Sequence, residues 1–101
     1  MNKKYELNAW WGKKYKLSIV RHTYAYDNSL AIELVDKGEP FAMLSVCIPE
    51  YPHTNENCIF VDTNNCSWAE EFIESNGLGK PTGMYAMSGF CCYPEYEMSD
   101  C

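Results

Sequence analysis

One histidine and two cysteines are the side chains best suited to hold a metal or do thiol chemistry. They are His53, Cys58 and Cys66, and imidazole and thiolate are ligands that zinc accepts. Their spacing differs from the pairs found in zinc knuckles and thioredoxin-type proteins, because the sequence holds no C-x-x-C. The group supports an alternative hypothesis, a small metal- or thiol-dependent module, whereas the main hypothesis assigns no cofactor and no metal ligand.

Three glutamates, Glu70, Glu71 and Glu74, form a second group of chemically capable residues. Acid–base catalysis by carboxylates needs a shielded cleft that separates their pKa values. On a helix these three fall opposite the apolar stripe that starts at Trp68 and Phe72, so a solvated face is the simpler interpretation. No phosphate-binding loop, nucleophile elbow or paired-histidine motif accompanies them. An enzyme is therefore not favoured, and no catalytic residue is assigned.

The charge is distributed unevenly along the chain. Residues 1–21 carry six basic side chains and one acidic one, whereas residues 22–101 carry two basic and 13 acidic ones. The formal net charge of −6 argues against direct nucleic-acid binding, which depends on neutralising phosphates. The basic segment is expected to be the solvent face of a hairpin, since edge lysines guard against sheet pairing. The acidic remainder suits a protein partner with a basic surface.

The cysteine content and the hydropathy pattern indicate a cytoplasmic protein. Six cysteines in 101 residues are fewer than the roughly 8–10% typical of disulfide-rich secreted domains. No uncharged apolar run approaches the roughly 18 residues that a membrane-spanning helix needs. Polar and charged residues interrupt the N-terminal segment too early for a secretory signal. Free thiols and no membrane contact are therefore expected.

Hydrophobic alternation predicts an antiparallel meander over residues 14–48. Tyr15, Leu17 and Ile19 alternate with polar residues, as in a half-buried strand. Turns at residues 27–29 and 37–40 then separate this strand from two more, because their residue types favour tight turns. The residues expected in the core are Leu17, Ile32, Leu44 and Val46. Short turns between consecutive strands favour antiparallel neighbours.

The second half of the chain predicts one helix between further strands. Ser67 and Glu70 have the spacing of a capping box, and Gly77 is a natural helix stop, so a helix over about 67–76 is expected. Strands are expected near 58–62 and 84–93. One short helix covers one face of a sheet, which predicts a two-layer α+β fold. The whole chain, 1–101, is interpreted as one domain, with a loosely attached N-terminal strand at 1–12 and an acidic tail at 97–101.

Surplus tyrosines accompany the acidic residues near the end of the chain. Tyrosine is enriched among the residues that dominate binding energies at interfaces, and carboxylates can stand in for phosphates on a basic surface. The residues expected to bind a partner are Glu70, Glu71, Glu74, Tyr93, Glu95, Tyr96 and Glu97.

Two regions of the sequence resemble a known family. They are FVDTNNCSWAEEFIE (60–74) followed by NGLGKPTG (76–83), and LAIEL (30–34) followed by GEPFAMLSV (38–46). Together they resemble a domain-of-unknown-function family, DUF4313, of short proteins from plasmids, conjugative elements and phages of Firmicutes. The resemblance covers about residues 14–96 and brings no catalytic residues with it.

What the resemblance implies is a protein of a mobile genetic element. Small acidic proteins of such elements are often inhibitors of host defence, so the resemblance implies an anti-CRISPR or anti-restriction type of inhibitor. The sequence is therefore interpreted as a non-enzymatic interaction protein that inhibits a nucleic-acid-handling defence enzyme through an acidic, aromatic-bearing surface. A homodimeric accessory protein, paired through an exposed sheet edge, is the other alternative.

Overall fold

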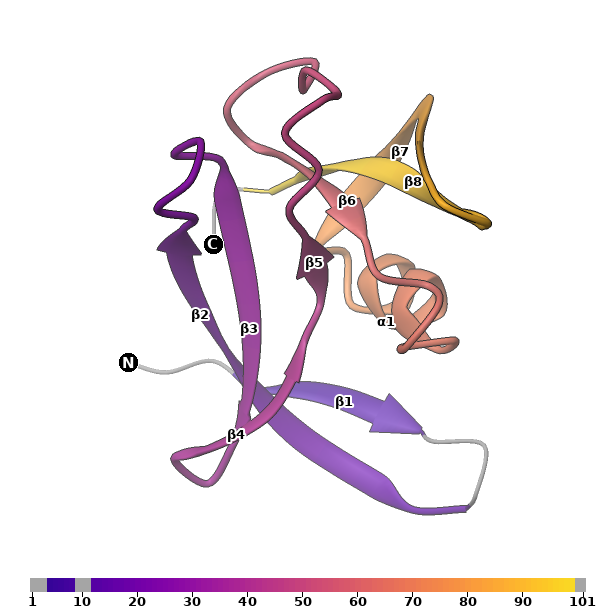
Figure 1. Cartoon of the computed structure of the whole chain (residues 1–101). Helices are drawn as coiled ribbons and strands as arrows, with labels where there is room; N and C mark the ends of the chain where they lie inside the picture. The colour runs from indigo at the N-terminus through magenta and orange to yellow at the C-terminus, as the bar shows by residue number, and fades with distance from the viewer. Residues whose placement is uncertain (1–3, 9–11, 100–101) are drawn as a thin grey trace.

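The computed structural model describes residues 4–8 and 12–99, and within them the chain forms two four-stranded sheets and one helix (Figure 1). The first sheet has the order β1-β2-β3-β4, and all its neighbours are antiparallel. Its strands are β1 (Tyr5–Asn8), β2 (Lys14–Thr23), β3 (Leu30–Asp36) and β4 (Glu39–Met43). Residues 1–3, 9–11 and 100–101 of the expected N-terminal strand and acidic tail lie outside the described residues.

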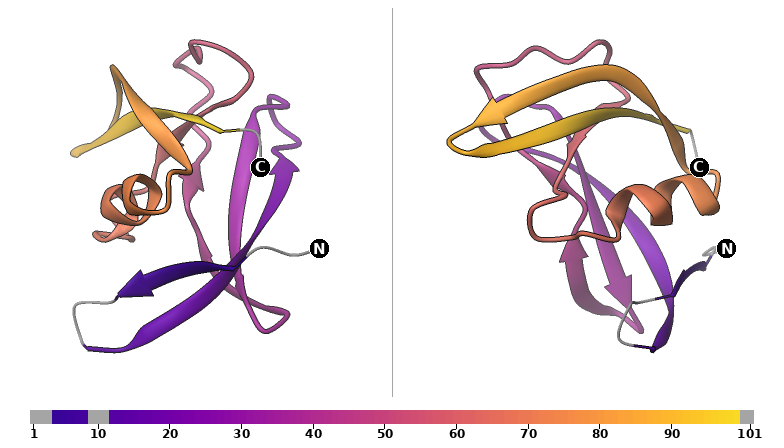
Figure 2. Two further views of the ribbon diagram at one scale, coloured as in Figure 1. Left: turned by 180° about the vertical axis from the view of Figure 1, so that it is seen from behind. Right: turned by 90° about the vertical axis from the view of Figure 1, so that its right-hand side faces the viewer.

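The second sheet has the order β5-β6-β8-β7 and is also antiparallel throughout. Its strands are β5 (Ser45–Val46), β6 (Cys58–Val61), β7 (Gly79–Ser88) and β8 (Cys91–Met98), with the helix α1 (Ala69–Ser75) between β6 and β7. The helix packs on one side of this sheet (Figure 2). The expected α+β class, antiparallel pairing and short helix are confirmed, but the strands divide between two sheets.

Leu44 is the residue at which the chain passes from one sheet to the other. The strand expected over 41–48 is divided into β4 and β5. The Leu44 amide donates to the carbonyl of Ile32 in the first sheet, and the Leu44 carbonyl accepts from Asp62, next to the second sheet, both at 2.9 Å. The Leu44 side chain is fully buried. One residue therefore joins the two sheets through its backbone and fills the core between them.

The main core contains most of the side chains predicted for it. Leu17, Ile32 and Leu44 are each 0% exposed and lie in one cluster with the buried face of α1. Val46, also expected there, is half-buried and packs in a smaller cluster with Phe60. Val46 pairs with Phe60 across β5 and β6, so both point away from the main core. The prediction for Val46 is wrong because the chain passes from the first sheet to the second at Leu44.

The ends of α1 differ in how well the sequence predicts them. The predicted capping box is wrong, because the helix begins after Trp68 without a side-chain cap hydrogen bond. The predicted stop is confirmed, because Gly77 has a φ of +64°. The Asn76 side chain bonds both the amide and the carbonyl of Glu6 in β1, at 3.3 and 3.0 Å. With Leu7 buried at 3% exposure, these bonds attach β1 firmly to the helix.

The C-terminal region is a hairpin where one strand near 84–93 was expected. Strand β7 begins at Gly79, before the strand that the sequence predicts near 84–93. A Cβ atom on Gly79 would lie 2.7 Å from the Glu97 carbonyl oxygen, so the close approach of β7 to β8 requires glycine. Glu97 and Met98, expected in an acidic tail, form the end of β8, and Met98 is buried.

No helix in the described ranges has both the length and the apolar character needed to cross a membrane. The cysteines within these ranges, Cys47, Cys58, Cys66, Cys91 and Cys92, are free thiols as expected, whereas Cys101 lies outside them.

Candidate functional site

The helix α1 presents its carboxylates to solvent because its apolar side chains are anchored on the opposite face. Ala69, Phe72 and Ile73 are buried, whereas Glu70, Glu71 and Glu74 are exposed. Aromatic contacts hold the start of the helix against the first sheet: the Trp68 ring lies 6.1 Å from the Phe41 ring and 6.0 Å from the Phe72 ring. The exposed face predicted for the three glutamates is confirmed.

A tyrosine beneath the helix holds two of these carboxylates. The Tyr96 hydroxyl lies 3.0 Å from Glu70 Oε1 and 2.8 Å from Glu74 Oε2, and Tyr96 itself is 1% exposed. Burial, together with Glu74 and Glu70, raises the pKa of Tyr96 far above its usual range, so the hydroxyl remains a neutral donor. The expectation that Tyr96 is a surface anchor is therefore wrong, because β8 turns this side chain under α1.

The hydroxyl of Tyr96 has one hydrogen and two carboxylates that converge on it. Glu70 and Glu74 are also four residues apart, and like charges at that spacing destabilise a helix. The fold thus concentrates negative charge at one place although this costs stability.

Replacing Glu74 by Gln should therefore stabilise the protein. We expect Glu74→Gln to raise the free energy of unfolding by about 0.2–0.5 kcal/mol, because it removes one like charge while Glu70 still accepts from Tyr96. The midpoint of urea denaturation at low ionic strength measures the effect. The matched control is Glu71→Gln, which leaves the pair on Tyr96 intact and should change stability less. A loss of stability in Glu74→Gln contradicts this view of the pair.

Among the residues that the structure describes, no lysine or arginine forms an ion pair with the helix carboxylates. In the described part of the chain the ion pairs involve histidines, His22 with Glu33 at 2.9 Å and His53 with Glu95 at 3.6 Å, and no lysine or arginine pairs with a carboxylate. Glu6 lies beside the helix and lines the same small hollow as Glu71. We call Glu6, Glu70, Glu71 and Glu74 together the acidic face.

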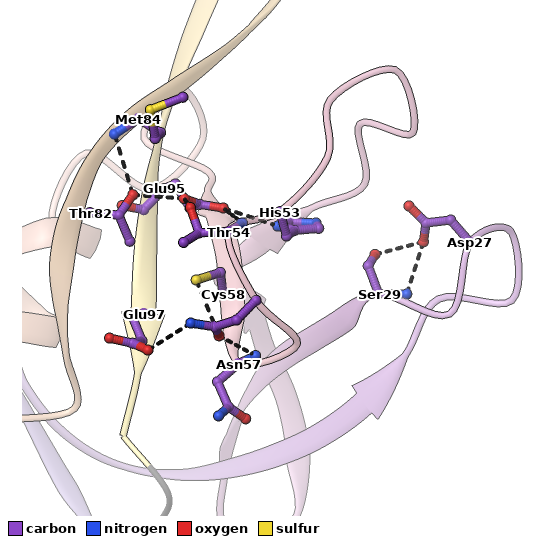
Figure 3. Close-up of polar contacts among 11 residues, drawn as sticks. Asp27, Ser29, His53, Thr54, Asn57, Cys58, Thr82, Met84, Glu95 and Glu97 are labelled. Carbon is purple, nitrogen blue, oxygen red and sulfur yellow. Dashed lines mark hydrogen bonds and ion pairs between the residues drawn. The ribbon is translucent and has the colours of Figure 1, made fainter.

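Glu95 forms a buried polar network on the other side of β8 (Figure 3). Its carboxylate is 1% exposed and accepts from the Thr54 amide at 2.8 Å, from the Thr54 hydroxyl and from the Thr82 hydroxyl at 2.7 Å. Burial raises the pKa of Glu95, but these hydrogen bonds and His53 outweigh it, so the pKa lies below its usual range. Glu95 braces the loop before β6 onto β7 and β8, and its expected place on a partner surface is wrong.

The three residues of the metal alternative are not brought together. The His53 ring stacks on Phe60 with centroids 4.5 Å apart, Cys58 Sγ donates to Asn55 Oδ1 at 3.5 Å, and Cys66 Sγ donates to the Met43 carbonyl at 3.6 Å. Among the residues that the structure describes, no three of His, Cys, Asp and Glu are grouped so that they could hold a metal ion. The geometry therefore gives the metal alternative no support.

The thiols of this group are also poorly suited to nucleophilic chemistry. Burial is the main cause that raises the pKa of Cys58, and it raises the pKa of Cys66 to about 11. A thiol with a raised pKa is almost entirely protonated at neutral pH, and the thiolate is the reactive form. His53 and Cys58 border a hollow of about 420 Å³ between the turn at 27–30 and the loop before β6, but the raised pKa of Cys58 keeps its thiol protonated there.

The remaining residues predicted to bind a partner lie on the face of the sheet away from α1. Glu97 is half-buried and accepts from Asn55 Nδ2 at 2.8 Å. Tyr93 is half-buried and packs with Phe60 and Ala86. The predicted set is therefore split between two faces, and a role in binding stays a prediction for the helix carboxylates, Tyr93 and Glu97.

The sequence model of one protein family, Domain of unknown function (DUF4313), matches residues 17–100, which is most of the chain. The chain belongs to the DUF4313 family. The match contains the whole of α1 and the second sheet and begins inside β2. No curated protein and no solved structure matches this DUF4313 protein.

One group of exposed large apolar side chains of this DUF4313 domain was not predicted from the sequence. They lie on the β7–β8 hairpin, with exposed fractions of 60% for Met84, 58% for Tyr85, 55% for Met87 and 108% for Phe90. The signal in the sequence is a run without charge over residues 83–93. Such a run also fits a buried strand, and Tyr85 and Met87 are exposed because the short helix α1 does not reach this end of the hairpin.

Proposed function

We propose that this DUF4313 protein is a non-enzymatic interaction protein whose acidic face binds a basic surface of a partner protein. The observation that carries the proposal is the set of helix carboxylates that no lysine or arginine of the described ranges neutralises. Complementary charge across an interface speeds association and selects the partner. A guanidinium group of the partner could bridge Glu70 and Glu74, which converge on one hydroxyl. Binding would then relieve a repulsion that the free protein tolerates.

We further propose that the partner is a nucleic-acid-handling enzyme of host defence, inhibited in the manner of anti-CRISPR or anti-restriction proteins. Such enzymes carry dense lysine and arginine surfaces that bind phosphates, and a row of carboxylates can occupy the same surface. A mobile genetic element as the source and the cytoplasm as the location agree with this role. Support comes from the acidic face and from the resemblance of residues 30–46 and 60–83 to short proteins of such elements.

Charge reversal on the helix should cripple binding and leave the fold intact. The variant is Glu70→Lys, Glu71→Lys and Glu74→Lys together, and all three side chains are exposed. The measurement is surface plasmon resonance against immobilised Cas9 ribonucleoprotein and a type II restriction endonuclease, with and without competing duplex DNA. We expect the association rate with a bound target to fall about tenfold or more, and the loss to be largest at low salt.

The matched control reverses three other exposed glutamates, Glu39, Glu50 and Glu56, to lysine. It changes the net charge by the same amount, so it separates the acidic face from the general field of the protein. Equal losses in both triple variants would contradict a specific role for the acidic face. Unchanged binding in the helix variant, or binding that duplex DNA does not displace, would remove the proposed mimicry.

A further inference from the structure

The face of the second sheet that carries α1 continues beyond the helix. Tyr96 points to the helix from this face, and Pro94, two residues earlier in β8, shares it because side chains alternate along a strand. Tyr85 lies opposite Pro94, and Met87 lies opposite Cys92. Residues directly opposite each other share a face of the sheet. Tyr85, Met87 and Cys92 therefore belong to the face on which the helix sits.

The helix is too short to cover that part of the face. Seven residues of α1 span about 10 Å at the rise of an α-helix, whereas the eight residues of β8 span about 26 Å. The hairpin formed by β7 and β8 extends past the helix, as the right-hand view of Figure 2 shows. Accordingly Tyr96 is 1% exposed, but Tyr85 is 58% and Met87 is 55% exposed.

An uncharged apolar surface thus lies directly beside the acidic face. We call Tyr85, Met87, Phe90 and Cys92 the hairpin strip, since all four are exposed or lie at the hairpin turn within the charge-free run. Glu70 and Glu74 meet the hydroxyl of Tyr96. The backbone of Tyr96 is two residues, about 7 Å, along β8 from Pro94, the partner of Tyr85. The carboxylates of α1 therefore lie along one side of an exposed apolar surface of the sheet.

We propose that the hairpin strip and the adjacent acidic face together bind a basic amphipathic helix of the partner protein. The apolar side of such a helix would lie on the hairpin strip, and its lysine and arginine side chains would face Glu70 and Glu74. Helices with one apolar face commonly dock in this way, with anchors at helical spacing. A second copy of this chain is the less suitable occupant, because it repeats the net charge of −6 and the same uncharged strip. The inference rests on the proposed function, because it uses the same acidic face, and it names the kind of segment that the face recognises.

The test uses synthetic peptides of 18 residues as probes. The first is a leucine–lysine peptide with helical periodicity, the second has glutamate in place of each lysine, and the third is polylysine. Binding is measured by fluorescence anisotropy, and the helicity of the peptide by circular dichroism. We expect the leucine–lysine peptide to bind with a gain in helicity, polylysine to bind more weakly, and the leucine–glutamate peptide not to bind.

The decisive variant is Tyr85→Ser with Met87→Ser. This double variant should bind the leucine–lysine peptide tenfold or more weakly, because the peptide dissociates faster. The salt dependence of binding should stay that of the original protein. The matched control is Tyr26→Ser with Met43→Ser, an exposed tyrosine and methionine outside the hairpin, which should bind as the original protein does. Circular dichroism of both variants checks that the fold is retained.

The outcomes separate the inference from the proposed function. If Tyr85→Ser with Met87→Ser binds the leucine–lysine peptide normally while the helix charge reversal abolishes binding, the proposed docking site is wrong and the proposed function stands. If neither basic peptide binds, both are wrong. If the leucine–lysine peptide does not bind and sedimentation shows self-association that Tyr85→Ser with Met87→Ser abolishes, a second copy occupies the strip and the docking proposal is overturned.

Discussion

Leu44→Ala should lower the free energy of unfolding by about 2–5 kcal/mol. Leu44 is 0% exposed, and its backbone joins the two sheets by hydrogen bonds to Ile32 and Asp62. A cavity there removes contacts from both sheets at once, and neither sheet can close it without moving the other. Domains of this kind have about 5–15 kcal/mol of stability in total, so the variant should be marginally folded. Urea denaturation followed by circular dichroism measures the change.

The neighbouring residue provides the control for this experiment. Met43 is 39% exposed, so Met43→Ala loses less buried contact and should cost about 1 kcal/mol or less. A cost below about 1 kcal/mol for Leu44→Ala would contradict this expectation. It would mean that the junction between the sheets repacks freely around the cavity, which a well-packed core does not do.

Glu95→Gln should destabilise the protein at neutral pH and reduce the dependence of its stability on pH. Gln retains the shape of Glu but has one acceptor oxygen, so donors from Thr54 or Thr82 are left unpaired in a buried site. Each unpaired buried donor costs about 1–3 kcal/mol. Glu97→Gln is the matched control on the same strand, since its carboxylate is half-buried with one donor from Asn55, and it should cost less.

The sign of the pH effect follows from the lowered pKa of Glu95. Burial raises that pKa, but the hydrogen bonds from Thr54 and Thr82, together with the charge of His53, lower the pKa by more than burial raises it. The folded state therefore favours the ionised carboxylate, and the stabilisation is complete above the unfolded value of about 4.3. It is lost as pH falls through the lower, folded value, because the unfolded chain binds the proton more readily. Urea midpoints between pH 3 and 7 should fall less steeply for Glu95→Gln, and parallel curves would contradict this account.

The sequence by itself determined the elements that depend on local chemistry. Local patterns predicted the alternation in β2 and β3, the turn at Lys37–Gly38 and the stop at Gly77. The φ values of Lys37 and Gly38 are +52° and +83°. Strand alternation and positive φ are properties of a few adjacent residues, so they can be predicted from the sequence. The exposed face of α1 was readable for the same reason, since helical periodicity places Glu70 and Glu74 opposite Phe72.

The tertiary structure decided which faces are covered. Alternation shows that Glu95 and Tyr96 point to opposite sides of β8, but it does not show that a loop buries the one and a helix buries the other. Likewise, Tyr85 and Tyr96 share one face of one sheet, but Tyr85 is exposed and Tyr96 is buried, because α1 is long enough to cover only Tyr96. Covering depends on segments distant in the sequence and on their lengths in space, which no local pattern records.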